Sequence, residues 1–555
     1  MILPGRLLVL GFCFVLLSAG FSQTTNDLPF EWSGQYGLRS INGNLLWHRD
    51  WTSGPILFDR LVAIYPLRLG PAVADRFAVH SMGNFPQFSP PPDSLPIISR
   101  FNYQRGDFNF DQLEVEARFS EPGSQVNLMG FKRSYAGQIA EFILPSGVEV
   151  PMQQSYRFDY RSNAQKNGQF ELSLLRLLSN SGLPDSSVRG YYNDQITAGG
   201  ILLQKPFGSG ILDLHASQLH YKQNSGKPSN DTTYSQKLVR SFLSSRYRRP
   251  LESNAELLLF FAVNQQAAPS ILRTWYTVLT GYENQLLKAA AGVSIIDLAV
   301  SPHLRIDLIP SLAGLNVNMH IAYYKRRVPR VFLSEQLDKS TQWFNGCFTV
   351  IKSSDNFDIT LETGIIQSPD YHYLKEVAGT DNFITQRSSA YLWHGMTQLD
   401  WQITDEWLLE CNYRHTGYDQ VTLSDGIRDR INLGIEGKLK FILKDRLDLY
   451  ARLDIQGWLN RDPAFGFDPY RTVPYSGIAD AEPINNHWPI SFQLRAVITT
   501  VTITYQMENL AYELSPLLAR INSSLSPDSQ KITGNRFFPA MGSFIRFGIE
   551  WNFEK

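Results

Sequence analysis

Hydrophobic and polar residues alternate along much of this chain, and the alternation predicts β-strands with one apolar and one polar face. The pattern is clearest in residues 446–459. The apolar face of this segment carries Leu447, Leu449, Ala451, Leu453, Ile455 and Leu459, and the opposite face carries Arg446, Asp448, Tyr450, Arg452, Asp454 and Gln456. A strand of this kind separates an apolar environment from a polar one.

The pattern recurs from residue 97 to the C-terminus, often in neighbouring runs that predict hairpins. Residues 431–441 alternate just before 446–459, and only 442–445 separate them. Counting the runs predicts about 22 strands, with boundaries good to about 2–4 residues. The predicted strands are 97–104, 110–120, 124–134, 153–162, 168–178, 188–204, 208–222, 232–247, 253–265, 273–283, 286–300, 303–310, 314–326, 341–352, 357–367, 390–403, 406–416, 428–443, 445–459, 487–496, 498–511 and 543–553.

Composition favours a membrane barrel over other β-proteins. The 555 residues have a net charge of −1 and a mean hydropathy of −0.21, yet 13% are aromatic. Helical membrane spans need about 20 mostly apolar residues each, and a nearly neutral chain has no positive field that would gather nucleic acid. A soluble propeller would repeat a motif about every 40–50 residues, and no such motif recurs.

Backbone polar groups in lipid must all be paired, so a membrane-spanning sheet has to close on itself. We therefore predict an all-β fold: a large transmembrane antiparallel β-barrel of about 22 strands (18–22), even in number. Tight turns are predicted at 121–124 and 404–406. Longer loops rich in Gly, Pro, Asn, Asp and Ser are predicted at 179–187, 223–232, 368–389, 417–427, 460–486 and 512–542, on the outside of the cell.

The N-terminal residues predict export. Arg6 precedes an apolar stretch, 7–21, and small residues stand near its end at 19, 20 and 22, which is typical of a secretory signal peptide. We assign 1–23 to this signal, 24–96 to a small N-terminal segment and 97–555 to the barrel. The expected location is the outer membrane of a Gram-negative-type cell, in contact with its lipids.

The C-terminal strand, 543–553, places Ile545, Phe547, Ile549, Trp551 and Phe553 on one face. Phe547, Ile549, Trp551 and Phe553 resemble the terminal signal that the barrel-assembly machinery reads in outer-membrane proteins. Upstream, Asn509-Leu510 ends the preceding run, and Pro539 and Gly542 lead into the last strand.

This C-terminal arrangement is similar to the barrel end of TonB-dependent receptors, although Ala540 and Met541 separate the Pro from the Gly. The resemblance implies a plug domain inside the barrel and a TonB-type energy-coupling protein as partner. Residues 24–96 are too few for a full plug, but 57–72 faintly resembles a plug segment that leads to Gly-Pro. We therefore expect a short or degenerate plug-like segment. A periplasmic or lumen-filling extension is the alternative.

Residues for chemistry are sparse. The sequence shows no Walker-type phosphate loop, no His-Glu-x-x-His and no Gly-x-Ser-x-Gly motif, so we predict no enzyme and no cofactor. Cys347 and Cys411 lack the clustered His or Cys partners of a zinc site, and no metal site is predicted. The dispersed histidines His48, His215, His220, His394 and His415 are interpreted as strand-face residues, with a rim site beside carboxylates as the alternative.

The candidate functional residues are those of the ionic strand faces. The lumen-facing candidates are Arg446, Asp448, Arg452, Asp454, Arg546 and Glu550. They either line a polar path for a solute or form a structural charge ladder.

Signal, strand count and C-terminal strand together favour an outer-membrane transport protein that takes up a solute through the barrel lumen. The alternatives are a passive porin-like channel and an outer-membrane protein without a transport role.

Overall fold

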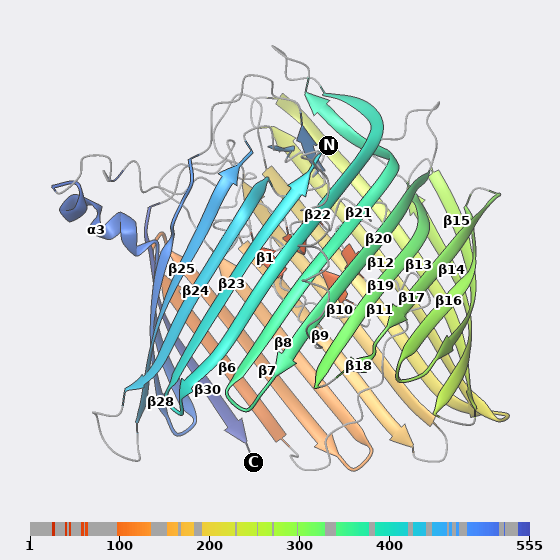
Figure 1. Cartoon of the computed structure of the whole chain (residues 1–555), viewed down its shortest axis with the longest axis horizontal. Coiled ribbons are helices and arrows are strands. Elements are labelled where there is room, and N and C mark those ends of the chain that lie inside the picture. The colour runs from red at the N-terminus through yellow and green to blue at the C-terminus, as the bar shows by residue number, and fades with distance from the viewer. Residues whose placement is uncertain are drawn as a thin grey trace, which may run out of the picture.

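The main body of the chain is one closed antiparallel β-barrel (Figure 1). The computed structural model describes residues 97–554 apart from 135–151, 165–167, 183–190, 228–229, 252–253, 269–270, 297, 313, 328–339, 377–382, 420–425, 440–446, 463–465, 469–472, 477–484, 521–526 and 528–541. Before residue 97 it describes only five short strands. The predicted signal peptide, 1–23, lies outside the described residues.

The barrel has 22 long strands, so the predicted fold and strand number are confirmed. They are β6 (Ile97–Gly106), β7 (Phe110–Glu121), β8 (Ser124–Ser134), β9 (Met152–Ala164), β10 (Gly168–Gly182), β11 (Tyr191–Phe207), β12 (Gly210–Lys227), β13 (Asn230–Leu251), β14 (Ala255–Ala268), β15 (Ile271–Glu283), β16 (Leu287–Ile296), β17 (Ala299–Leu308), β19 (Leu315–Arg327), β20 (Ser340–Ser353), β21 (Phe357–Glu376), β22 (Phe383–Thr404), β23 (Trp407–Tyr418), β24 (Ile427–Leu439), β25 (Asp448–Arg461), β28 (Ile490–Ile498), β29 (Val501–Glu508) and β30 (Phe544–Glu554).

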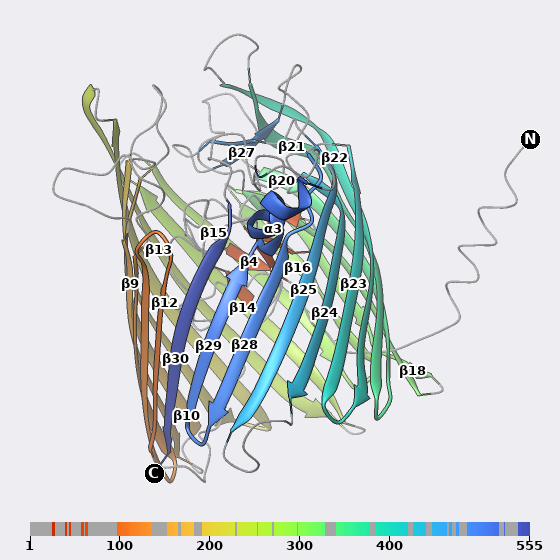
Figure 2. The same ribbon diagram turned by 90° about the vertical axis from the view of Figure 1, so that its left-hand side faces the viewer.

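Each long strand pairs with its neighbour in the chain, and the last strand closes the ring on the first. β30 pairs with β6 in a register that sets Trp551 opposite Phe101 and Arg546 opposite Gly106. The C-terminus lies at the end of the barrel where the short turns gather (Figures 1 and 2). Closure leaves no unpaired strand edge, which a membrane requires.

Alternation separates the two faces of the wall. On β30, Phe547, Trp551 and Phe553 are 43–47% exposed, whereas Phe544 and the polar positions between them are less exposed. The exposed apolar side chains form the outer face, and the opposite positions form what we call the inner face. The outer face therefore suits lipid.

Two tight turns match their predicted positions. Gly123, with a φ of +80°, completes the turn between β7 and β8, a backbone conformation that favours glycine because it has no Cβ. The turn between β22 and β23 joins Thr404 to Trp407.

Three predicted connections are wrong. The turn expected at 301–302 lies at 297–298, where Leu298 has a φ of 67°. The loops expected at 223–232 and 368–389 are largely strand, because β12, β13, β21 and β22 run on into them, and β21 and β22 rise above the barrel in Figure 1. Strand that extends beyond the bilayer is polar on both faces, so alternation cannot reveal it.

Short elements complete the described part. These are β18 (Ser311–Leu312), β26 (Gly466–Asp468), β27 (Val473–Ser476) and the helix α3 (Leu510–Leu518). α3 begins in the last two residues of the predicted strand 498–511 and continues into the loop predicted at 512–542. Among the described residues, no helix has the length and apolar character to cross a membrane.

The N-terminal segment contributes two small sheets. One contains β1 (Thr25–Asp27), β2 (Arg39–Ile41) and β3 (Asn44–Leu45), and the other contains β4 (Leu57–Asp59) and β5 (Val62–Ile64). Both views place these short red strands within the outline of the barrel (Figures 1 and 2).

Candidate functional site

An ionic cluster on the inner face centres on Arg452 of β25. Its guanidinium pairs with Glu410 of β23 and with Asp454, whose Oδ1 is 2.7 Å from Nη2. Glu436 of β24 lies 3.9 Å from Arg452 and accepts a 2.9 Å hydrogen bond from Arg495 of β28. Two cations therefore face three carboxylates, and the cluster carries a formal charge of −1.

A second ionic cluster spans the seam where the barrel closes. Arg546 of β30 donates a 2.5 Å hydrogen bond to Glu508 of β29. Arg100 of β6 donates two hydrogen bonds, of 3.1 and 3.2 Å, to the carboxylate of Glu550 and lies 3.9 Å from Glu114. The pair of Arg100 and Glu550 ties the first barrel strand to the last one.

A polar hollow of about 330 Å³ lies between the two clusters. It takes in Arg495 from the first cluster and Arg546 and Glu550 from the second. The remaining lining residues are Gln104, Gln493, Thr502, Thr504, Gln506 and Gly548. Amide, hydroxyl and charged groups with no large apolar side chain make this a surface that a hydrated solute can contact.

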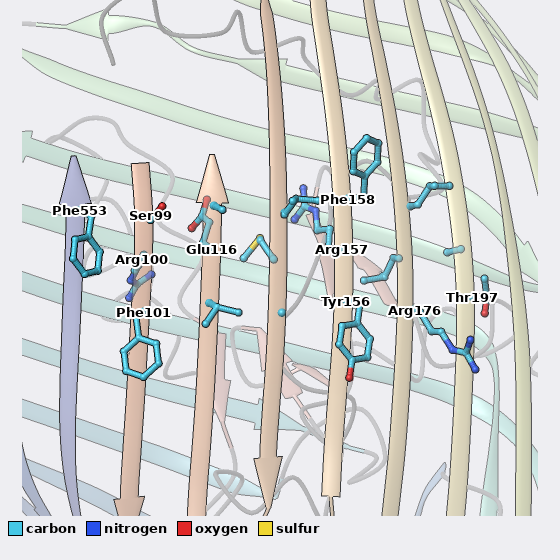
Figure 3. A pocket seen from close by; sticks show the side chains of 18 residues that line it. Ser99, Arg100, Phe101, Glu116, Tyr156, Arg157, Phe158, Arg176, Thr197 and Phe553 are labelled. Atoms are coloured by element: carbon cyan, nitrogen blue, oxygen red, sulfur yellow. The ribbon is translucent and has the colours of Figure 1, made fainter. Parts of the chain in front are cut away.

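A larger hollow, of about 780 Å³, has a different character. Figure 3 shows Phe553, Phe101 and Tyr156 among its lining side chains, on strands from β30 to β9. These three side chains are 38–53% exposed on the outer face. The hollow is therefore apolar and suits lipid chains rather than a transported solute.

The structure brings most of the lumen-facing candidates into these clusters. Arg452 and Asp454 belong to the first cluster, and Arg546 and Glu550 belong to the second. Asp448 pairs with Lys438 at 2.7 Å and is 49% exposed. Arg446 lies outside the described residues. A role for the six residues in a solute path stays a prediction.

The C-terminal residues lie on the outer face. Trp551 and Phe553 stack with ring centroids 4.3 Å apart, and Phe547 and Ile549 share that face of β30 by alternation. Their role as an assembly signal stays a prediction.

Two of the five histidines considered from the sequence, His394 on β22 and His415 on β23, are strand residues as interpreted and also contact carboxylates. His394 Nε2 lies 3.0 Å from Glu362 Oε1, and His415 Nδ1 lies 2.6 Å from Asp429 Oδ1. The sequence predicted no metal site, but Cys347, Glu362 and His394 each place a ligand atom within 4.8 Å of the other two. Sequence reasoning missed this group because the strand register, not sequence spacing, joins the three residues.

Comparison with solved structures identifies the fold. The FrpB iron transporter of Neisseria meningitidis aligns over 96% of this chain and 97% of its own, with a TM-score of 0.65 and 9% identity. The chain has the barrel fold of TonB-dependent receptors. The copper transporter OprC aligns over 84% of this chain and 82% of its own, with a TM-score of 0.59 and 9% identity.

A variant of the ferric enterobactin receptor PfeA of Pseudomonas aeruginosa gives similar values. It aligns over 83% of this chain and 81% of its own, with a TM-score of 0.60 and 10% identity. No family model and no curated protein matches the sequence. The resemblance inferred from the C-terminal strand is confirmed for the fold.

Proposed function

We propose that this protein is an outer-membrane transporter that takes up a solute through its barrel lumen. The observation that carries the proposal is the closed 22-strand barrel with charged clusters and a polar hollow on its inner face. A barrel of this width encloses more space than its own wall side chains fill. The apolar outer face is in contact with outer-membrane lipids.

The N-terminal segment, 24–96, is the proposed plug. The short strands within the barrel outline support this assignment (Figures 1 and 2). A plugged barrel needs an energy input to open, and the proposed source is a TonB-type coupling protein in the inner membrane. The proposal also includes export by the signal at 1–23 and insertion by the barrel-assembly machinery.

The inner face supports recognition of a polar or charged solute. The cluster around Arg452 carries excess carboxylate, and guanidinium and amide groups line the polar hollow. The structural neighbours are named as transporters of iron and copper and as a ferric enterobactin receptor. Iron, copper and ferric chelates are therefore the first solutes to assay.

Single-channel conductance of the purified full-length protein in planar lipid bilayers tests the plugged transporter against a passive porin. We expect a closed baseline with rare, brief openings. A matched variant without 24–96, checked for folding by heat-modifiable migration on gels, should give large steady openings. Steady openings of the full-length protein would favour the porin instead.

A further inference from the structure

Three side chains with metal-binding chemistry converge on the inner face, away from the ionic clusters. They are Cys347 on β20, Glu362 on β21 and His394 on β22, and their ligand atoms lie within 4.8 Å of one another. His394 is only 4% exposed, and the Glu362 side chain is 8% exposed. The group is thus sheltered within the wall rather than spread over a solvated surface.

The strand register explains the convergence. Cys347 is opposite Gly364 on β21, and Gly364 is opposite His394 on β22. Adjacent strands lie about 4.8 Å apart, so the Cα atoms of Cys347 and His394 are about 10 Å apart across β21. Their side chains can approach each other only over a residue that has no side chain between them.

Gly364 meets this requirement. A methyl group at this position would overlap Cε1 of His394 and lie 3.0 Å from its Nε2. The imidazole therefore occupies the space directly above the glycine. An alanine there would push the ring away from Cys347.

The hydrogen bonds around the group orient it for an ion. Thr349 Oγ1 donates a 3.3 Å hydrogen bond to Oε2 of Glu362, while Oε1 faces His394 Nε2 at 3.0 Å. Within the described part of the chain, the buried Nδ1 of His394 has no hydrogen-bond partner. Such an atom costs about 1–3 kcal/mol unless a water or an ion satisfies it.

We propose that Cys347, Glu362 and His394 form a binding site for a divalent transition-metal ion of the zinc class. Thiolate, imidazole and carboxylate are the ligands that Zn²⁺ uses in proteins, at about 2.0–2.3 Å. A tetrahedral ion with such bonds sets its ligand atoms about 3.3–3.8 Å apart. The ligand atoms here lie within 4.8 Å of one another, and His394 Nε2 is 3.0 Å from Glu362 Oε1, so side-chain adjustments on the order of 1 Å reach that spacing. Three protein ligands leave a fourth position for water or another ligand.

Binding converts the Cys347 thiol to a thiolate and releases its proton. The site does not depend on the proposed transport function, because equilibrium binding to the purified barrel requires neither a coupling protein nor a solute gradient. A failure of the transport proposal would therefore leave the metal site untouched, and the reverse also holds.

The test is Co²⁺ and Zn²⁺ binding to the full-length protein in detergent, without a histidine tag. We expect one equivalent of Co²⁺ with a thiolate charge-transfer band, which Zn²⁺ displaces. Cys347→Ser should abolish the band, and Glu362→Gln and His394→Gln should each weaken Zn²⁺ binding at least about tenfold, since loss of even an outer-shell partner weakens metal binding about 10–100-fold.

The matched control is Cys411→Ser, since Cys411 is also a free cysteine but lies on the outer positions of β23; it should bind as the wild type does. Gly364→Ala keeps all three ligands and should still weaken binding. Where a variant folds poorly on heat-modifiable gels, alkylation of the wild-type chain decides: Zn²⁺ should protect Cys347 and not Cys411. Absence of a thiolate band, or equal alkylation of Cys347 with and without Zn²⁺, would overturn the proposal.

Discussion

Asp213 on β12 gives the sharpest stability prediction, because its carboxyl group is fully buried beside two guanidinium groups. It is 0% exposed. Arg246 Nε donates to it at 2.8 Å, Arg248 Nε donates at 3.0 Å, and Gln204 Nε2 donates at 2.7 Å. The two guanidinium side chains are only 15% and 21% exposed. Asp213 therefore accepts hydrogen bonds from two largely buried cations, and Glu256 lies 3.9 Å from Arg248.

Asp213→Asn removes the charge while keeping the shape and an oxygen for Gln204. Removing one partner from a buried ion pair destabilises a protein by about 3–5 kcal/mol, because the other charge stays buried without compensation. We expect a loss of this size in the free energy of unfolding. The assay is guanidinium unfolding from lipid vesicles, followed by tryptophan fluorescence and by heat-modifiable migration.

The matched control is Asp448→Asn. Asp448 also pairs with a cation, Lys438 at 2.7 Å, but it is 49% exposed, and pairs exposed to water contribute little. Its unfolding midpoint should not move measurably. Equal midpoints for Asp213→Asn and Asp448→Asn would refute the reasoning that burial sets the energy of these pairs.

Three further predictions concern the ionic cluster, a loop and a turn. Glu436→Gln should lower the unfolding free energy less than Asp213→Asn does, because the Glu436 side chain is 24% exposed. Added salt should reduce this loss, and a loss that does not depend on salt would contradict the prediction. Burial and Arg461 lower the pKa of His487, outside the barrel strands, to about 4. The unfolded histidine takes up its proton near pH 6.5, so stability falls as pH drops from about 6.5 to about 4, by up to about 3 kcal/mol. Amide hydrogen exchange at the Trp458–His487 backbone pair should therefore accelerate as the pH drops over that range, after correction for intrinsic rates. His487→Gln should remove this pH dependence. Unchanged protection in the wild type would contradict the prediction. Gly123 has a φ of +80°, so Gly123→Ala should lower the unfolding free energy by about 1–2 kcal/mol. The control is Gly395→Ala, where an added Cβ meets no atom within 4 Å and the substitution should be neutral. Equal unfolding midpoints for the two variants would show that the turn is not strained.

Alternation predicted the barrel because a membrane wall has a different solvent on each face. Each predicted strand corresponds to one observed strand, and the run at 446–459 corresponds to β25. The errors lie where that contrast of solvents ends. β21 continues to Glu376 and β22 begins at Phe383, and both of these extensions are rich in polar side chains. Their pairing depends on backbone hydrogen bonds, which the side-chain pattern does not reveal.

The ionic face could be predicted in part. Arg452 and Asp454 are two residues apart on one strand, so alternation alone places them together. Glu410 and Glu436 come from other strands, and their contact with Arg452 depends on register across β23, β24 and β25. The same limit hid the group of Cys347, Glu362 and His394, whose members meet only because Gly364 stands between two of them in the sheet.

The central claim is energised uptake through the barrel. The most direct measurement is the accumulation of iron and copper, supplied free and as ferric chelates, in a deletion strain and in the same strain complemented with the wild-type gene, with and without an uncoupler of the inner membrane. The account predicts that complementation raises accumulation of at least one of these solutes and that the uncoupler removes the gain. Equal accumulation in both strains would contradict transport of these solutes, and a gain that survives the uncoupler would contradict energy coupling.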